Sequence, residues 1–481
     1  LTARGGRQAV VTGLAVDSRD VRDGFLFAAM PGSKLHGGEF IQYALRMGAA
    51  AILTDPTGAD IAKGELKASD AALIVTEAPR EALARTAALW FGAQPQTVIA
   101  VTGTNGKTSV ATFVRQIWML LGLEAVNLGT TGVEGAWQAP LAHTTPEPIT
   151  LHRVLAEAVS HGITHAAMEA SSHGLDQRRL DGVALTAAGF TNITQDHLDY
   201  HPSFQDYFDA KAGLFARVLP EDGAAVVNID GERGVDMAAI AEARGCDVIT
   251  VGRDAGEMLL GNSQVDATGQ TISFKYDGTQ YVRRLSLIGD FQAENVMLAA
   301  AIVIACGESP LAVFDTLEDL RTVRGRMQLA ATRENGAAVF VDYAHTPDAV
   351  ARALKALRPH VLGRIIAIVG AGGDRDATKR PLMGKAAAEY ADLVIVTDDN
   401  PRSEDPAVIR ASVLAGAPDA MEVGDRAEAI LRGVDALGPG DALLIAGKGH
   451  ETGQVIGTDI LPFDDVEQAS VAVAALDGRI A

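Results

Sequence analysis

Cysteine is nearly absent from this chain of 481 residues, which contains only Cys246 and Cys306. The two lie far apart in the sequence and have none of the short spacings of metal-binding cysteines. A disulfide framework or a cysteine-ligated metal is therefore not expected, and the composition favours a reducing, cytoplasmic location.

Positive charge is also scarce, because 41 Lys and Arg residues face 61 Asp and Glu residues and the formal net charge is −20. A general nucleic-acid-binding protein needs a basic face, and this balance argues against one. Phosphate ligands stay compatible with it, since a few backbone N–H groups and lysines can bind a phosphate against a negative background.

Long hydrophobic runs are scarce too, and we expect neither a signal peptide nor a membrane span. The longest apolar stretches, such as VMLAAAIVIA, extend for about ten residues, whereas a membrane-spanning helix needs about 20. With 48% hydrophobic and 21% charged residues, the composition is typical of a soluble protein with several cores. Because residue 1 is leucine, we expect that a short natural N-terminus precedes it.

What recurs instead is a short apolar run that stops at a glycine-rich or polar loop and continues into a helical pattern. Examples are TVIAVTGTNGKT, HAAMEASSHG, RIIAIVGAGGDRD and ADLVIVTDDNPR. Strands that alternate with helices predict an α/β fold with mostly parallel sheets. The length suggests about three domains, which we place at residues 1–93 (a smaller α/β domain), 94–328 (a central P-loop-type domain) and 329–481 (a Rossmann-like domain).

The stretch TVIAVTGTNGKTS is typical of a strand, a glycine-rich loop and the start of a helix. The loop N–H groups can surround a phosphate, Lys107 can reach the outer phosphates, and the Thr108 hydroxyl can reach Mg²⁺. The strict phosphate-loop pattern requires glycine at position 101, where this chain has valine. A glycine-rich turn with a surface lysine is the alternative, but a strand and a helix in register favour phosphate binding.

A nucleotide site needs hard oxygen ligands for Mg²⁺. Glu169, at the end of an apolar strand, is the first candidate, because a buried unpaired carboxylate is costly. Asp196 and His197 are further candidates, although histidine is an uncommon Mg²⁺ ligand and more often a hydrogen-bonding or core residue.

Lys211 shares a predicted helix face with Tyr207, Phe208 and Phe215. A lysine among aromatic residues usually extends to water, and the sequence alone favours that interpretation. A buried lysine is instead pushed towards its neutral, nucleophilic form, which can react with CO₂ to give a carbamate that attracts Mg²⁺.

Charged residues follow three strands of the last domain, at Arg375, at Arg402 and at the stretch Lys448–Glu451. Arg402 stands in TDDNPRSEDP, where Asp-Asn-Pro favours a turn and Asp405 is a candidate cap for the next helix. Arg402 could therefore tie down a turn, and separate surface ion pairs are the alternative for either arginine. Two arginines and one carboxylate that converge on a crevice would instead suit a zwitterion, with Glu451 taking the ammonium.

Together these loops resemble the Mur ligase family, the ATP-dependent amide-bond ligases of peptidoglycan precursor synthesis. The motifs GTNGKTS, EASSHGLDQRR, TNITQDHLDYH, DYAHTPDA, GGDRDATKRPLM, DNPR and AGKGHE occur in the family's order and span nearly the whole chain. Within the family the likeness is greatest to the ligases that add the third residue of the stem peptide. The DNPR motif is similar to that of the members that add meso-diaminopimelate.

The resemblance implies four groups of site residues. For ATP it implies Gly103, Thr104, Asn105, Gly106, Lys107, Thr108, Ser109, Asn295, Arg326, Asp342 and His345. For the UDP-sugar-peptide it implies Val16, Ser18, Ser33, Lys34, Leu35, Thr144, Thr145, Ser171, Gln177 and Arg179. For diaminopimelate it implies Arg375, Asp399, Asn400, Pro401, Arg402, Gly447 and Glu451. Catalysis and metal binding would rest on Lys107, Thr108, Glu169, His197 and Lys211, the last as N6-carboxylysine beside one or two Mg²⁺ ions.

Three positions depart from the family's pattern. His143 stands where an asparagine is expected, FQAENVM is a loose version of an Asn-rich helix start, and Arg324 replaces a proline. These departures weaken the roles of His143 and Asn295 and leave the family resemblance intact.

The implied reaction joins meso-diaminopimelate to UDP-N-acetylmuramoyl-L-alanyl-D-glutamate through an acyl phosphate made from ATP. These three substrates are the expected partners of a cytoplasmic monomer that binds no nucleic acid and has no membrane span. His345 and His450 are candidates for the general base by residue type only. The alternatives are a lysine-adding ligase, a ligase similar to folylpolyglutamate synthetase, and an inactive ATP-binding scaffold.

Overall fold

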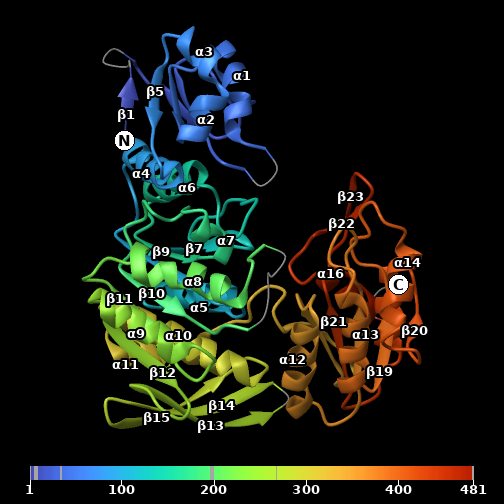
Figure 1. The fold of residues 1–481 in the computed structure, drawn as a ribbon. Coiled ribbons are helices and arrows are strands. Elements are labelled where there is room, and N and C mark those ends of the chain that lie inside the picture. The colour runs from blue at the N-terminus through green and yellow to red at the C-terminus, as the bar shows by residue number, and fades with distance from the viewer. Residues whose placement is uncertain (1, 5–8, 33–34, 195–199, 267, 479–481) are drawn as a thin grey trace. The chain divides into compact units, whose positions relative to one another are not determined.

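The computed structural model describes residues 2–4, 9–32, 35–194, 200–266 and 268–478, and Figure 1 labels many of their elements. The chain forms two compact units. The first consists of Leu1–Gly256 and Leu298–Pro310, and the second of Glu257–Met297 and Leu311–Ala481. The division into three domains at residues 93 and 328 stays a prediction.

The first unit begins with a five-stranded sheet in the order β1-β5-β4-β3-β2, in which only β1 runs antiparallel to its neighbour. Its strands are β1 (Thr2–Arg4), β2 (Gly13–Ala15), β3 (Phe25–Ala29), β4 (Ala51–Thr54) and β5 (Ala72–Val75). The helices of this part are α1 (Ile41–Arg46), α2 (Pro56–Ile61), α3 (Lys63–Lys67) and α4 (Pro79–Phe91).

The same unit continues with strands in the order β12-β11-β10-β6-β9-β7-β8, parallel except for β8. They are β6 (Thr97–Thr102), β7 (Ala125–Gly129), β8 (Gly132–Gly135), β9 (His165–Glu169), β10 (Ala187–Phe190), β11 (Ala224–Asn228) and β12 (Asp247–Gly252). The helices are α5 (Lys107–Leu120), α6 (Pro148–Ser160), α7 (Ser172–Asp176), α8 (Phe204–Gly213) and α9 (Gly234–Arg244).

The second unit contains an antiparallel meander of β13 (Met258–Asp266), β14 (Gly269–Tyr276) and β15 (Thr279–Leu285). The helix α10 (Asp290–Ala305) has residues in both units, and α11 (Pro310–Thr316) follows it.

A six-stranded sheet in the order β16-β17-β21-β18-β19-β20 forms the rest of the second unit, with only β16 antiparallel. Its strands are β16 (Gln328–Thr332), β17 (Ala338–Asp342), β18 (Ile365–Val369), β19 (Leu393–Val396), β20 (Met421–Glu422) and β21 (Ala442–Ala446), and β22 (Gly453–Ile456) with β23 (Asp459–Pro462) makes a separate hairpin. The helices are α12 (Pro347–Leu357), α13 (Lys379–Tyr390), α14 (Pro406–Leu414), α15 (Arg426–Asp435) and α16 (Asp465–Leu476).

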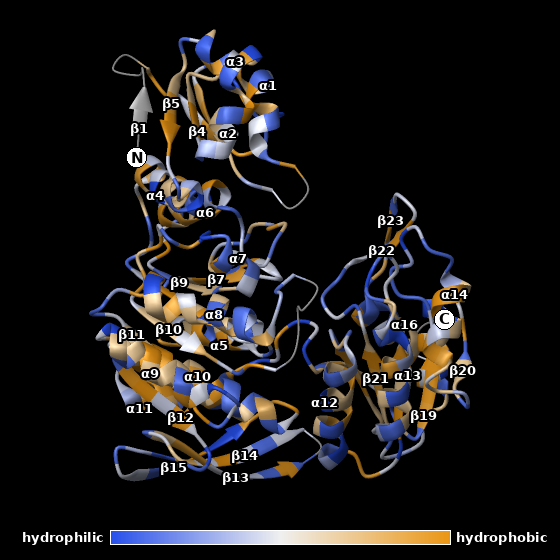
Figure 2. Cartoon of the chain, in the orientation of Figure 1, coloured by the Kyte–Doolittle hydropathy of each residue, from blue (hydrophilic) through white to orange (hydrophobic). Residues whose placement is uncertain are grey.

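Parallel strands are buried on both faces of their sheet, and the residues of β18 are apolar on both sides. Ile365, Ala367 and Val369 enter one hydrophobic core, while Ile366 and Ile368 enter the other. In Figure 2 the strands β19 and β21 are hydrophobic in colour, and hydrophilic residues mark the helices around them. The α/β fold with mostly parallel sheets is confirmed.

Among the residues that the structure describes, no helix is long and apolar enough to cross a bilayer.

His152 is a polar residue in the core of the first unit. It lies on α6 and is 1% exposed, and among the described residues neither ring nitrogen has a hydrogen-bond partner. Burial lowers the pKa of His152 from its ordinary value of 6.5 to about 4. The unfolded chain therefore takes up a proton at higher pH than the folded chain does, and folding stability falls as the pH drops from 6.5 to 4.

Between pH 6.5 and 4, we expect the free energy of unfolding of His152→Leu to fall by about 3 kcal/mol less than that of the wild type. Each unit of the pKa difference between the folded and unfolded chain contributes about 1.36 kcal/mol. Guanidinium unfolding followed by tryptophan fluorescence at pH 4 to 7 measures the effect. His161→Leu, an exposed histidine at the end of the same helix, is the control. Equal pH dependence in His152→Leu and the wild type would contradict the prediction.

Candidate active site

The loop between β6 and α5 has the shape of a phosphate cradle. Gly103 and Gly106 have left-handed φ angles of 149° and 89°, and a Cβ at Gly103 would lie 1.8 Å from the Thr191 hydroxyl, so only glycine fits there. The helix α5 begins at Lys107 without a side-chain cap, which leaves its first N–H groups available to an anion. The Lys107 ammonium donates to the carbonyl oxygens of Gly103 and Thr104, at 2.9 Å each.

Glu169, at the end of β9, brings its carboxylate to this loop although it is only 2% exposed. Its Oε2 accepts a hydrogen bond of 2.9 Å from the Thr108 hydroxyl, and its Oε1 accepts one of 2.7 Å from the backbone N–H of Thr130. The backbone leaves space for this carboxylate at Gly129, where a Cβ would lie 2.0 Å from Oε1. A carboxylate and a hydroxyl beside a phosphate cradle are the donor types that Mg²⁺ prefers.

Lys211, on α8, is buried against the same loop. It is 1% exposed, its Nζ donates to the carbonyl oxygen of Gly103 at 2.7 Å, and it lies 4.5 Å from the centroid of the Tyr207 ring. The interpretation that the sequence alone favoured, a lysine extending to water, is wrong. The helix turns its aromatic face inward, and Lys211 goes with it.

A cavity of about 610 Å³ in the first unit is lined by residues of its N-terminal part, such as Phe27 of β3, and by residues at the start of α6 and after α7. Five of the residues that the resemblance implied for the UDP-sugar-peptide line it, namely Val16, Ser18, Leu35, Gln177 and Arg179. Four charged residues that sequence reasoning missed line it as well: Asp17, Arg19, Arg80 and Glu147. Arg80 belongs to none of the motifs. The sequence marks it only by its position at the start of a helix.

Hydrogen bonds lead from this cavity to Glu169. Arg179 donates to the carbonyl oxygen of Thr145 at 2.5 Å. The Thr145 hydroxyl in turn donates to the carbonyl oxygen of Glu169 at 2.9 Å and accepts from the N–H of Ser171 at 3.0 Å. Thr144 lies 3.0 Å from Thr130, hydroxyl to hydroxyl. The cavity and the phosphate loop therefore belong to one connected arrangement.

Arg402 lies in a turn of the second unit, where both its backbone and its side chain form hydrogen bonds. Its φ of 52° is left-handed, its N–H donates to the carbonyl oxygen of Val455, and its carbonyl accepts from Gly457. The guanidinium donates to the carbonyl oxygen of Gly373 at 2.8 Å. Asp405 caps α14 through the N–H of Ala407, as the sequence predicted.

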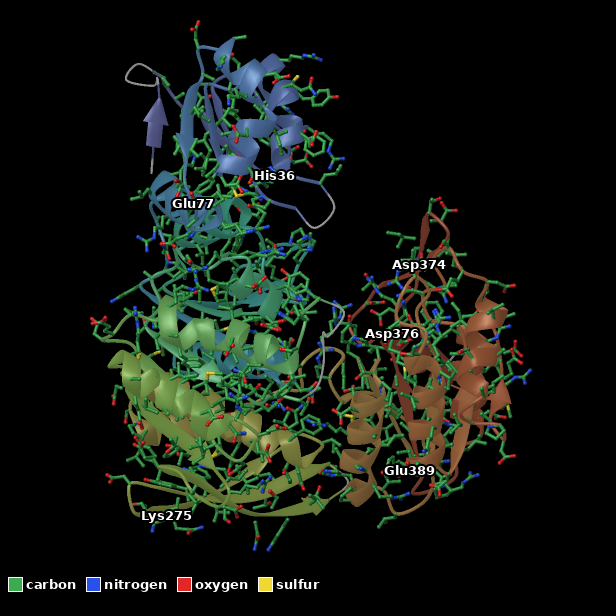
Figure 3. The ribbon with its side chains drawn as sticks, in the orientation of Figure 1. His36, Glu77, Lys275, Asp374, Asp376 and Glu389 are labelled. Carbon is green, nitrogen blue, oxygen red and sulfur yellow. The ribbon has the colours of Figure 1, made fainter. Side chains whose placement is uncertain are left out.

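The GGDRD loop after β18 meets this turn. A Cβ at Gly372 would lie 2.8 Å from Nη1 of Arg402 and 3.9 Å from Cγ of Arg375, so the two arginines flank one glycine. Figure 3 labels Asp374 and Asp376 of the same loop. Hydrogen bonds from Ser403 lower the pKa of Asp374 and keep it ionised beside these cations.

Arg426 supports the strand ends beneath this turn, and sequence reasoning missed it. It is 2% exposed and forms a two-pronged ion pair with Asp465, at 2.7 Å for each hydrogen bond. It also donates to the carbonyl oxygens of Ala446 and Asp398, at the ends of β21 and β19. Gly447 follows Ala446 directly, and a Cβ at Gly447 would lie 2.5 Å from Oδ2 of Asp399.

Arg326, Asp342 and Tyr343 form a second charged cluster of this unit. The Arg326 guanidinium lies 4.5 Å from the centroid of the Tyr343 ring, whose other neighbours are His345 and His450. Burial raises the pKa of Asp342, although Arg326 opposes the shift. Burial also lowers the pKa of His450 to about 4, so that its ring is neutral at pH 7.

The other residues that the resemblance implied lie in several different places. Asn295, on α10, donates to the side-chain oxygen of Gln292 at 3.2 Å. Asn105 and Ser109 lie in the phosphate loop and the first turn of α5, and Pro401 is buried in the DNPR turn. Ser33, Lys34, Asp196 and His197 lie outside the described residues.

Three family models match successive parts of the chain. They are the Mur ligase family catalytic domain at residues 10–91, the Mur ligase middle domain at 101–303 and the Mur ligase glutamate ligase domain at 325–449. Together they span the cavity, the phosphate loop and the DNPR turn.

Curated relatives match nearly the whole length. The chain is 49% identical over 472 residues to the UDP-N-acetylmuramoyl-L-alanyl-D-glutamate–2,6-diaminopimelate ligase of Bradyrhizobium diazoefficiens, with 97% of this chain and 95% of the relative covered. It is 46% identical over 475 residues to the ligase of the same name from Caulobacter vibrioides, with 97% and 96% covered.

Solved structures agree with this. A structure of a ligase with that name has a TM-score of 0.70 at 32% identity and covers 97% of this chain and 95% of its own. A MurF ligase from Thermotoga maritima in complex with ADP shares the fold, with a TM-score of 0.62 at 17% identity and 98% and 99% covered. The chain belongs to the Mur ligase family.

Proposed function

We propose that this protein is the cytoplasmic, ATP-dependent ligase that adds meso-2,6-diaminopimelate to UDP-N-acetylmuramoyl-L-alanyl-D-glutamate. The observation that carries the proposal is the 49% identity, along 97% of the chain, to a relative with this activity in its name. The D-glutamyl carboxylate attacks the γ-phosphate of ATP to give an acyl phosphate and ADP. The diaminopimelate amine then attacks the acyl carbon, the amide bond forms, and phosphate leaves.

The phosphate loop supports a role in binding ATP. The uncapped start of α5 and the glycines at 103 and 106 suit a triphosphate, and Lys107 lies at the loop to neutralise its charge. Phosphoryl transfer depends mainly on such positioning and charge neutralisation. Arg326, Asp342 and His345 are the proposed ATP contacts in the second unit.

The buried carboxylate of Glu169 and the hydroxyl of Thr108 fit a magnesium ion. Bound there, Mg²⁺ would supply positive charge to the phosphates during transfer. His197 is a further proposed ligand.

Lys211 is the proposed site of carbamylation. Its neutral amine attacks CO₂, a nitrogen–carbon bond forms, and the released proton leaves an anionic carbamate. Burial at 1% exposure supports this, because it favours the neutral amine. The carbamate would then join Glu169 as an oxygen ligand at the phosphate loop.

The cavity of the first unit is the proposed site of the UDP-sugar-peptide. Its apolar walls suit a nucleoside, and Arg179 supplies positive charge for the diphosphate or the peptide carboxylates. The Arg179–Thr145–Glu169 connection supports a path for the peptide from the cavity to the phosphate loop. The DNPR turn, Arg375, Gly447 and Glu451 are the proposed site of diaminopimelate.

Phosphate release from ATP tests the function, with the UDP-muramoyl dipeptide as acceptor and meso-diaminopimelate, L-lysine or no amine added. We expect turnover with diaminopimelate far above the low rate with lysine, none without an amine, and a product heavier by one diaminopimelate residue in mass spectrometry. Equal turnover with lysine would indicate the lysine-adding activity. A lack of turnover with every amine would refute the proposal and return the folate ligase and the inactive scaffold to consideration.

A further inference from the structure

Lys448 is a buried cation within the segment proposed to bind diaminopimelate. It follows β21 between Gly447 and Gly449, whose φ angles of 118° and 56° are left-handed. A Cβ at Gly449 would lie 2.7 Å from Cβ of Tyr343, so the segment is packed too tightly for larger residues. The Lys448 side chain is 0% exposed.

The Lys448 ammonium has an acceptor for each of its three N–H groups. It donates to Oδ1 of Asn400 at 3.1 Å, to Oε2 of Glu451 at 3.1 Å and to the carbonyl oxygen of Gly453 at 2.5 Å. A buried charge is retained in a fold when it is paired and hydrogen-bonded in this way. This lysine is therefore part of a specific network and not a surface charge.

Asn400 completes the network, and its amide can face only one way. Its Oδ1 accepts from Lys448 and from the N–H of Val455 at 2.9 Å, while its Nδ2 donates to Oε2 of Glu451 at 2.8 Å. The opposite orientation would place the amide NH₂ against two donors. The amide of the DNPR motif is therefore fixed by Lys448.

Glu451 is held by one of its two carboxylate oxygens. Oε2 receives both Lys448 and Asn400, whereas no described residue donates to Oε1. The Glu451 side chain is 32% exposed, while that of Lys448 is fully enclosed. The network thus fixes the direction of the carboxylate and leaves one oxygen for a ligand.

We propose that Lys448 is a positioning residue for amino-acid recognition, which orients Glu451 and Asn400 so that the second oxygen of Glu451 accepts an ammonium of the incoming diamino acid. The inference rests on the proposed function, in which that amino acid is meso-diaminopimelate. A purely structural lysine, which only attaches the β22–β23 hairpin through Gly453, would affect stability and not the affinity for one substrate.

Lys448→Met tests the inference, because methionine is unbranched and apolar and fits a buried site without a charge. We expect the KM for meso-diaminopimelate to rise about 10- to 100-fold, by analogy with the loss of a residue that orients a metal ligand. The KM values for ATP and for the UDP-muramoyl dipeptide should stay unchanged, and kcat should change less than about threefold. The exposed Lys275 of β14, labelled in Figure 3, gives the control Lys275→Met.

A double-mutant cycle with Glu451→Gln shows whether Lys448 acts through Glu451. If it does, Lys448→Met should add less than about twofold to the KM of Glu451→Gln, since coupled residues are not additive. Losses that multiply, or a lower kcat with an unchanged KM for diaminopimelate, would overturn the inference.

Asn400→Asp covers the case in which Lys448→Met does not fold. It keeps the acceptor for Lys448 and Val455 but sets a carboxylate oxygen against Oε2 of Glu451. The same selective rise in the KM for diaminopimelate is therefore expected, and its absence would overturn the inference.

Turnover by the wild type separates this inference from the proposed function. A wild type that turns over diaminopimelate, with variants of unchanged KM, refutes this inference alone. A wild type without such turnover refutes the proposed function, and the inference with it.

Discussion

Lys107→Ala is expected to abolish ATP turnover, with a loss in kcat on the order of 10³-fold. The ammonium lies at the loop through its hydrogen bonds to Gly103 and Thr104, where it would neutralise the charge that develops on the transferred phosphate. Alanine removes this charge but keeps the first turn of α5, because alanine is a good helix former. The chain should therefore fold normally and fail in the chemical step.

Phosphate release under saturating substrates measures this effect, and circular dichroism with thermal unfolding checks the fold. Lys107→Arg retains a positive charge in a different shape, and we expect only partial activity from it. The exposed Lys275→Ala provides a control with wild-type turnover. Substantial activity in Lys107→Ala would return the loop to the alternative of a glycine-rich turn with a surface lysine.

Arg402→Ala is expected to lower kcat/KM for meso-diaminopimelate by about 10²- to 10³-fold, the effect of losing a charged hydrogen-bond partner of a carboxylate. Arg402 already occupies a left-handed conformation at φ 52°. Alanine carries the same Cβ and meets the same backbone strain, so the turn itself should be little changed. The loss should therefore come from the guanidinium.

Initial rates with meso-diaminopimelate and with L-lysine separate the two roles of Arg402. Lysine lacks the second carboxylate, so its low rate should be nearly equal in the wild type and in Arg402→Ala. Arg432→Ala removes an arginine of α15 whose side chain is 52% exposed, and it should change neither rate. If both amines lost activity to the same extent in Arg402→Ala, the arginine would serve only the turn.

The local pattern of this sequence was sufficient for the fold class. Runs such as IIAIV of β18 are apolar at every position, which is typical of a strand buried on both faces. Glycine-rich or polar loops follow these runs, and such loops bind ligands in parallel sheets because they lie at one edge. For the same reason the sequence alone predicts the phosphate loop, Glu169 and the DNPR turn as candidate sites.

The side-chain surroundings could not be predicted in the same way. The spacing around Lys211 was compatible with a lysine in water, and only the packing of α8 against the Gly103 loop buries it. Arg80 and Arg426 belong to no motif, and their contacts depend on segments far away in the chain.

The sequence by itself thus determined the α/β class, the candidate loops and the resemblance to the Mur ligases, because hydrophobic periodicity and motif spacing are local properties. The tertiary structure alone decided which groups are buried and which are paired: Lys211 lies beneath the phosphate loop, Lys448 lies between Asn400 and Glu451, and His152 is buried with no hydrogen-bond partner among the described residues. Burial and hydrogen bonding depend on residues that are distant along the chain, and no local pattern contains that information.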